Sequence, residues 1–298
     1  MENIRGAILM SLAMLGFAIE DTLIKFLSDS IPTGQIIILL GLGGSLFFGT
    51  LAIAKGDRLL HPDFNKRPFQ IRLLGEFLGV LGFVTAIALM PLSTASAILQ
   101  ATPLAVTLGA ALFLGETVGW RRWLAIIIGL IGVLLIIRPG TADFDMTSCA
   151  ALVGVFGLAA RDLATRRITA EISSRIIALS GFAIVIPAGL IFLAFGLNGS
   201  QWHPMARSDL LVLLSTLVAG VSAYYGIVMA TRIGEMSVIA PYRYTRLVFA
   251  MILGMIVFQE RPDALTLLGA AIIVASGIYT LWREARLMQT SKPPSTTV

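Results

Sequence analysis

Five ionisable residues interrupt long apolar segments of the chain: Glu76, Arg161, Asp162, Arg243 and Arg246. A charged side chain inside a membrane helix costs at least about 2.5 kcal/mol on insertion scales, so such residues usually face a cavity or a partner. The three arginines outnumber the two carboxylates, which leaves one guanidinium for a carboxylate or phosphate. Arg246 is the preferred ligand because its planar guanidinium presents paired donors, with Arg243 or Arg161 assisting.

The same charges also have a purely structural interpretation. Asp162 could pair with Arg243, for example, and hold two parts of the chain together without contacting a ligand. Other polar side chains could line the same cavity, although tyrosines near helix ends often serve as interfacial anchors instead. These candidates are Gln100, Tyr224, Tyr225, Tyr242 and Tyr244.

A second polar group, formed by Glu20, Asp21 and Lys25, lies near the end of the first apolar segment. The spacing of Asp21 and Lys25 places them on one helix face. A carboxylate in a narrow vestibule is suited to proton coupling, because burial favours its neutral form. We prefer Glu20 or Asp21 to Glu76 for this role, and the alternative is that the group is only a solvated helix end.

Two prolines, Pro103 and Pro241, interrupt apolar segments that have matching places in the two halves of the chain. A proline frees a backbone carbonyl and weakens the helix around it, which suits a gate or a binding site. The alternative is an ordinary kink whose hydrogen bonding is repaired by neighbouring helices.

The residues that could support enzymatic chemistry are scattered. His61 and His203 fall in different connecting segments, on opposite sides of a membrane, and Cys149 is the single cysteine. We therefore predict no catalytic residues, no metal site and no cofactor. The net charge of +5 does not indicate a nucleic-acid partner, because the basic residues lie between apolar segments.

The elements that position these residues are predicted to be membrane-spanning helices. Apolar residues make up 57% of the chain and charged residues 13%, whereas a soluble domain carries about 25% charged residues. A spanning helix needs about 20 apolar residues. The apolar segments predict ten spans, at 4–27, 33–54, 70–90, 93–114, 121–138, 147–168, 174–196, 208–231, 237–258 and 264–282.

Basic residues between the spans predict that both termini are cytoplasmic. In that orientation fifteen basic residues fall on the cytoplasmic side and four, Lys25, Arg138, Arg207 and Arg261, fall on the other side. Positive charge concentrates on the cytoplasmic side of membrane proteins. We therefore expect a multi-pass protein of a bacterial inner membrane.

The two halves of the sequence are similar at a constant shift. Gly82, Ala86, Ser93 and Glu116 match Gly226, Ala230, Ser237 and Glu260, each 144 residues later. This predicts two repeats of five spans, 1–140 and 141–284, followed by a disordered cytoplasmic tail, 285–298. Five is an odd number, so the second repeat must enter the membrane in the opposite orientation, as in many transporters.

These patterns resemble a known family. The segment from Met90-Pro91-Leu92-Ser93 through Gly115-Glu116 to Arg138-Pro139, together with its second copy, resembles an EamA domain. The chain is thus similar to EamA-type members of the drug/metabolite transporter superfamily over nearly its whole length. Two shorter segments, 161–167 and 241–246, are similar to signatures found in bacterial metabolite carriers.

The resemblance implies an all-α membrane protein with ten helices in two inverted repeats, a central cavity lined by both halves, and alternating access. We accordingly expect a secondary transporter of a small metabolite, with export of a carboxylate-bearing or amino-acid-like compound as the first choice. Import of a larger heteroaromatic compound such as riboflavin or S-adenosylmethionine is the alternative. A passive channel and an intramembrane enzyme are the alternatives from other classes. The predicted partners are the lipid bilayer and a small-molecule substrate, and the protein is expected to be a monomer or homodimer.

Overall fold

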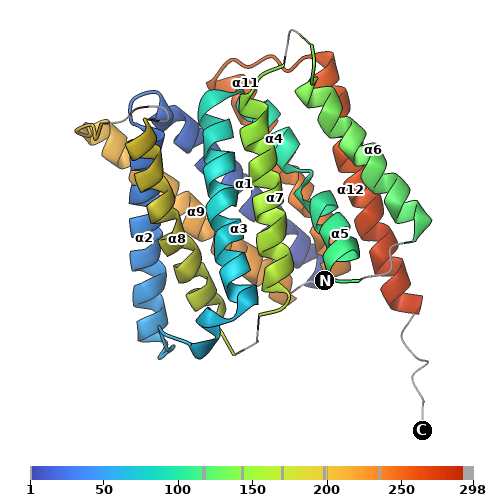
Figure 1. Cartoon of the computed structure of the whole chain (residues 1–298), viewed down its shortest axis with the longest axis horizontal. Coiled ribbons are helices and arrows are strands. Elements are labelled where there is room, and N and C mark those ends of the chain that lie inside the picture. The colour runs from blue at the N-terminus through green and yellow to red at the C-terminus, as the bar shows by residue number, and fades with distance from the viewer. Residues whose placement is uncertain are drawn as a thin grey trace.

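The computed structural model describes residues 2–115, 119–141, 144–168, 171–196, 199, 201–233 and 236–290, with the side chains at 232, 236, 237 and 284–290 left out. The predicted motif residue Glu116 lies outside the described residues. All regular elements in the described part of the chain are helical. Figure 1 shows these helices side by side in one bundle, with the start of α1 and the end of α12 toward the same end.

The helices follow the apolar segments closely. They are α1 (Glu2–Ser28), α2 (Thr33–Ala54), η1 (Pro62–Asn65), α3 (Arg67–Leu89), α4 (Leu92–Leu99), α5 (Thr102–Phe113), α6 (Trp120–Ile137), α7 (Thr147–Thr165), α8 (Ser174–Phe195), α9 (Arg207–Ile233), α10 (Met236–Ile239), η2 (Ala240–Tyr244), α11 (Thr245–Val257) and α12 (Ala264–Thr290). In the described residues, nine helical segments are long and apolar enough to cross a membrane. The fold is therefore that of a multi-pass membrane protein.

Two predicted spans are interrupted rather than continuous. The fourth consists of α4 and α5, which meet at Gln100 and Ala101, and the ninth consists of α10, the 3-10 helix η2 and α11. Pro103 and Pro241 lie in the first turn of α5 and of η2, where a missing backbone N–H leaves no helical hydrogen bond unmade. Each proline thus starts a new segment.

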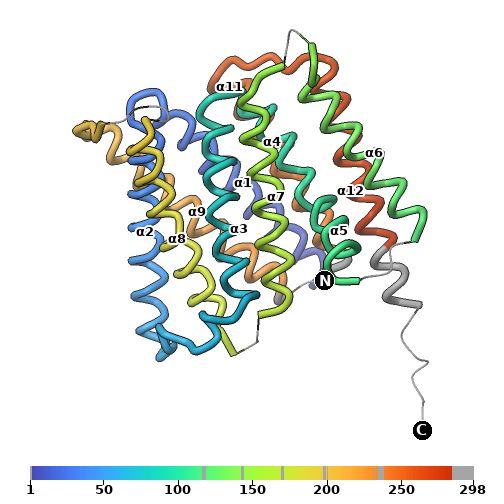
Figure 2. Tube along the Cα trace, viewed as in Figure 1, coloured from blue at the N-terminus to red at the C-terminus, as the bar shows by residue number. Residues whose placement is uncertain are grey.

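The main packing contacts join the two halves in a symmetric pattern. Helix α3 packs against α7, and its counterpart α9 packs against α1, while α2 packs against α8 and α6 against α12. Each of these partners comes from the other half of the sequence. The trace in Figure 2 shows the same intertwining, with α7 beside α3 and α12 beside α6.

Glycines determine how closely these helices approach. A Cβ built on Gly157 of α7 would lie 2.4 Å from the backbone nitrogen of Gly79 on α3, and one on Gly82 would lie 2.3 Å from that of Gly154. Helix backbones can approach this closely only where side chains are absent. Gly132 of α6 and Gly269 of α12 make a similar contact.

The outside of the bundle is apolar, as expected for contact with lipid. Leu46, Phe113 and Phe195 are among many large apolar side chains that are exposed. The inside holds a hydrophobic core that includes Phe83, Ile98 and Leu247.

The predicted start of the disordered tail at residue 285 was wrong. Helix α12 continues to Thr290, so residues 285–290 are helical. The remaining tail residues, 291–298, lie outside the described residues.

Candidate functional site

Arg246 and Asp21 form an ion pair between the two halves of the molecule. The Arg246 Nε lies 2.9 Å from Asp21 Oδ2, and Nη2 lies 2.7 Å from both carboxylate oxygens. Two parallel N–H donors to one carboxylate give strong and directional binding. The Asp21 side chain is 3% exposed and the Arg246 side chain 19%, so the arginine is the more exposed partner.

Two phenylalanines flank this ion pair. The guanidinium carbon of Arg246 lies 5.1 Å from the ring centre of Phe17 on α1 and 5.2 Å from that of Phe83 on α3. An aromatic face attracts a cation through its quadrupole. Helices α1, α3 and α11 therefore meet at one site, and neither phenylalanine was singled out from the sequence.

The position of Glu20 depends on a glycine of the neighbouring helix α9. A Cβ on Gly220 would lie 2.3 Å from Glu20 Oε1, so the carboxyl group occupies the space that a side chain would fill. Among the described residues, Glu20 has no hydrogen-bond or ion-pair partner, although Asp21 and Arg246 are nearby. The carboxyl group is thus adjacent to the ion pair without forming part of it.

Lys25, the third member of the polar group on α1, does not pair with Asp21. Its ammonium group lies 2.5 Å from the carbonyl oxygen of Met90 and 3.3 Å from that of Ile87, at the end of α3. Glu260 Oε1 is 3.9 Å away. The negative end of a helix attracts a cation, and this explains the place of Lys25.

A separate charge network links α3 and α7. Glu76 accepts from Arg161 at 3.1 Å and from Arg72 at 3.4 Å, and Arg161 also donates to Asp162 at 2.9 Å. Gly75 on α3 contacts the backbone of Arg161, whereas Phe83 is eight residues further along, about 12 Å at helical rise. The network is therefore distinct from the Arg246 site and matches the structural interpretation.

The pairing differs from the example given for the structural interpretation, because Asp162 pairs with Arg161 and not with Arg243. Arg72, a buried residue of α3, also belongs to the network. The five intramembrane charges therefore do not share one cavity.

The interrupted spans meet through Gln100. Its Nε2 lies 3.4 Å from the backbone oxygen of Arg243 in η2. Gln100 and Tyr244 occupy equivalent places in the two repeats, 144 residues apart, and Tyr244 packs against Gly277 of α12. The two breaks in the helices are thus in direct contact. The Arg243 side chain has no ion-pair partner within the described residues.

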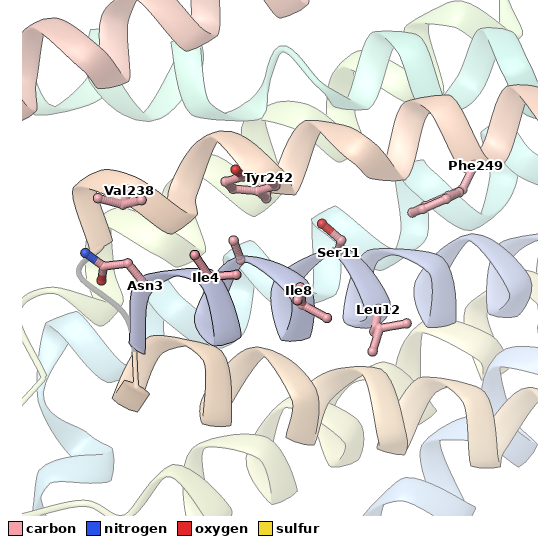
Figure 3. Close-up of a pocket in the computed structure, with 9 residues that line it drawn as sticks. Asn3, Ile4, Ile8, Ser11, Leu12, Val238, Tyr242 and Phe249 are labelled. Atoms are coloured by element: carbon pink, nitrogen blue, oxygen red, sulfur yellow. The ribbon is translucent and has the colours of Figure 1, made fainter. Parts of the chain in front are cut away.

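The other tyrosines lie away from the ion pair. The Tyr224 hydroxyl donates to the Ser174 carbonyl at 3.3 Å, and its ring contacts Phe48. Tyr225 is 61% exposed on the outer surface of α9. Tyr242 lies in a groove of about 340 Å³ between α1 and the ninth span, together with Ile4, Ile8 and Val238. Figure 3 shows that this groove is lined mainly by apolar side chains of the two elements.

Two further ion pairs join the repeats near the ends of the spanning segments. Arg175 donates to Asp57 at 2.6 and 2.9 Å, and hydrogen bonds from Arg175 and Ser173 hold the pKa of Asp57 below its ordinary value. Arg138 pairs with Asp263, whose pKa is lowered by hydrogen bonds from Thr266 and Arg138. In the described residues, no group of three His, Cys, Asp or Glu side chains is placed to hold a metal ion.

Comparison with known proteins gives a consistent result. The model of the EamA-like transporter family matches residues 4–138 and 146–282. The S-adenosylmethionine uptake transporter of Rickettsia prowazekii is 23% identical over 279 residues, which cover 93% of this chain and 92% of that protein. The riboflavin transporter of Vibrio cholerae is 26% identical over 289 residues, covering 95% of each.

Two more similarities extend over nearly the whole chain. The pseudopaline exporter CntI of Pseudomonas aeruginosa is 27% identical over 288 residues, 92% of this chain and 94% of that protein. A crystal structure with 18% sequence identity superposes with a TM-score of 0.58 and covers 96% of this chain and 99% of that chain, which shows a shared fold. The family model matches both repeats, and the protein therefore belongs to the EamA-like transporter family of the drug/metabolite transporter superfamily.

Proposed function

We propose that the protein is a secondary carrier for a small metabolite with an amino-acid-like head group, and that this group binds at Arg246 and Asp21. The supporting observation is the ion pair itself, which is contributed by α1 and α11 from different repeats. The arginine is partly exposed and is flanked by Phe17 and Phe83. Such a site offers a cation, an anion and aromatic surface within a few ångströms.

The existing ion pair favours a zwitterion over a simple anion. A substrate carboxylate that takes Arg246 from Asp21 would leave a buried carboxylate without its cation, which is strongly unfavourable. A substrate that also carries an ammonium group would neutralise Asp21 at the same time. The exchange then replaces one set of charge-assisted hydrogen bonds with another.

Transport would follow from movement of α1 relative to α11. Because Asp21 lies on α1 and Arg246 on α11, a substrate that bridges them contacts both moving parts. Its affinity therefore depends on their relative position, which is what alternating access requires. The interrupted fourth and ninth spans, whose second segments begin near Pro103 and Pro241, are the proposed gating elements.

We further propose that transport is coupled to protons through Glu20. Its carboxyl group lies beside the Asp21–Arg246 pair and has no cationic partner of its own among the described residues. A proton on Glu20 would make the three side chains neutral together, and its loss would leave one negative charge. Collapse of the proton gradient should then reduce the transport of substrate against its concentration gradient, and Glu20→Gln should make transport independent of the proton gradient.

The direction and orientation of transport are also proposals. We propose that both termini are cytoplasmic in a bacterial inner membrane, from the positive charge on that side. Export is the first candidate. The relatives include an uptake transporter for S-adenosylmethionine and a riboflavin transporter as well as an exporter, which favours import of such a compound as the second candidate.

Counterflow in proteoliposomes tests the carrier and its ligand. Vesicles are loaded with one unlabelled compound from a panel of amino acids, S-adenosylmethionine and riboflavin, and entry of the labelled compound is measured. A carrier gives accelerated entry, whereas a passive channel gives a saturation-free flux. Arg246→Ala and Asp21→Asn should each abolish counterflow of an amino-acid-like substrate, and Arg207→Ala, at an exposed arginine, is the control. Unchanged counterflow in both variants would exclude the proposed site.

A further inference from the structure

Glu260 connects the loop after α11 to the start of α4 in the other repeat. Its Oε1 accepts from the backbone N–H of Leu92 at 2.6 Å, and its Oε2 accepts from the N–H and the hydroxyl of Ser93 at 3.0 and 2.7 Å. These are otherwise unpaired donors at the first turn of a helix. One carboxylate from the second repeat therefore binds the first turn of an interrupted span of the first.

The backbone conformation before Glu260 directs its side chain toward α4. Gln259 has a φ of 55°, in the left-handed region that non-glycine residues seldom adopt. The Glu260 N–H donates to the Gly254 carbonyl at 3.1 Å, and a Cβ on Gly254 would lie 2.6 Å from Glu260 Oε2. The chain thus folds back over a residue without a side chain, which turns the carboxylate toward α4.

Lys25 extends the contact to two more helices. It belongs to α1, binds the last carbonyl groups of α3 and lies 3.9 Å from Glu260 Oε1. The Lys25 and Glu260 side chains are 15% and 9% exposed, so water screens their attraction only weakly. Helices α1, α3 and α4 are therefore tied to the loop between α11 and α12 at one end of the bundle.

We propose that Glu260, Lys25 and Ser93 form a latch that holds this end of the carrier closed and must open once in each transport cycle. The proposal rests on the alternating-access function proposed above. Glu260 acts as a positioning residue through α4, which leads directly to the break at Gln100. When this end opens, α4 and the α11–α12 loop separate, and the hydrogen bonds to Leu92 and Ser93 are exchanged for bonds to water.

Accessibility of a cysteine below the latch tests this proposal. Ser96 lies one turn beyond Ser93, is 2% exposed, and its hydroxyl has no hydrogen-bond partner among the described residues, so Ser96→Cys removes no bond. The reporter is made in a Cys149→Ser background, because the native cysteine is exposed. Labelling by a hydrophilic maleimide is measured in lipid nanodiscs, where both faces of the protein are accessible.

With the latch intact, the reporter should label slowly, because the reagent reaches only the pocket of about 310 Å³ beside Ser93 and Glu260. Glu260→Gln should raise the labelling rate about tenfold, since charge-assisted hydrogen bonds are lost. Lys25→Gln should act in the same direction and serves as a second variant if Glu260→Gln does not fold. Asp57→Asn, which removes an ion pair between the repeats at the opposite end, is the matched control and should leave the rate unchanged.

Equal labelling with and without the Glu260 substitution, in protein that elutes as a folded species, would show that Glu260 is only a helix cap. An equal increase in the Asp57→Asn control would show general loosening and would also exclude a latch. Labelling needs no substrate, so its outcome is independent of whether the proposed amino-acid-like ligand is correct.

Discussion

The interfaces α3–α7 and α1–α9 occupy equivalent places in the two repeats but differ in whether their carboxyl groups are paired with a cation. In α3–α7, Glu76 bridges Arg161 and Arg72 through one Nη atom of each, and the Nε and Nη1 atoms of Arg72 are buried without a hydrogen-bond partner in the described part of the chain. In α1–α9, the residue equivalent to Glu76 is Gly220, and the carboxyl group of Glu20 fills the space beside it. Similar helix packing therefore supports two different outcomes, a carboxylate that bridges two arginines in one interface and a carboxyl group without a cationic partner among the described residues in the other.

The difference indicates that the two interfaces have different roles, with α3–α7 important for stability and the α1 side for transport. A buried charge network is strongly destabilised by the loss of one member, so α3–α7 is expected to hold the repeats together. The α1 side carries Asp21, whose cation comes from α11, and leaves Glu20 available for a proton. Function is then expected where the charges are incompletely matched.

The largest effect is expected from breaking the α3–α7 network. Glu76→Gln should lower the free energy of unfolding by about 3 kcal/mol, because it leaves the buried Arg72 without its carboxylate. Glu20→Gln should change stability little but alter the pH dependence of transport. Thermal unfolding of both variants in detergent checks the contrast, and equal losses of stability would contradict the difference in roles.

Backbone proximity should give the next largest effect. Gly157→Ala places a Cβ 2.4 Å from the Gly79 nitrogen, so the helices must separate, at a cost of about 2 kcal/mol. Gly226→Ala in α1–α9 is the matched control, because its Cβ would lie 3.1 Å from the Cβ of Ala13. The unfolding temperature of Gly157→Ala should be several degrees lower than that of Gly226→Ala. A lower unfolding temperature in Gly226→Ala would contradict this prediction.

A smaller effect on stability, but a clear one on transport, is expected at Gly220. Gly220→Ala conflicts only with the end of the flexible Glu20 side chain, so the loss of stability should stay below about 1 kcal/mol. The added Cβ displaces the Glu20 carboxyl group from its place beside Gly220 and so changes its position relative to the Asp21–Arg246 pair. Proton-driven transport should fall, and unchanged transport with the normal pH profile would argue against a role for Glu20.

The smallest effect is expected for the Asp57–Arg175 pair, which joins the loop after α2 to the first turn of α8. The pKa of Asp57 is lower in the folded protein, so the pair stabilises fully above about pH 4 and less as the pH falls through the lowered value. A surface pair contributes at most about 1 kcal/mol. Unfolding at pH 6 and pH 3 should show a slightly weaker acid sensitivity in Asp57→Asn, and an identical pH dependence would assign that sensitivity to other carboxylates.

The sequence predicted the helices well because hydropathy is a local property. The span at 33–54 has the observed bounds of α2, and most other bounds agree within a few residues. The positions of Pro103 and Pro241 indicated the two interruptions. Ser93 and Glu260 both belong to the repeated motif, in which Ser93 matches Ser237 and Glu116 matches Glu260. Their direct contact was not predicted, although the repetition of the motif was a usable signal.

The candidate site was predicted only in part. Arg246 was predicted as a ligand from the chemistry of its guanidinium, and Glu20 and Asp21 were singled out from their place in an apolar segment, but the association of Arg246 with Asp21 was not predicted. Arg246 and Asp21 are 225 positions apart in the sequence, and Phe17 and Phe83 look like ordinary core residues in it. Their roles depend on the rotation of each helix, which local patterns do not report.

By itself, the sequence determined a membrane protein of ten apolar segments in two repeats, because each segment must satisfy its own backbone hydrogen bonds in lipid. Tertiary structure alone decided which charges meet. Glycines such as Gly79, Gly157 and Gly220 set the distance and rotation at which helices pack, and these contacts join residues far apart in the chain. Arg161 thereby belongs to the α3–α7 charge network, and Arg246 belongs to the candidate site between α1 and α11.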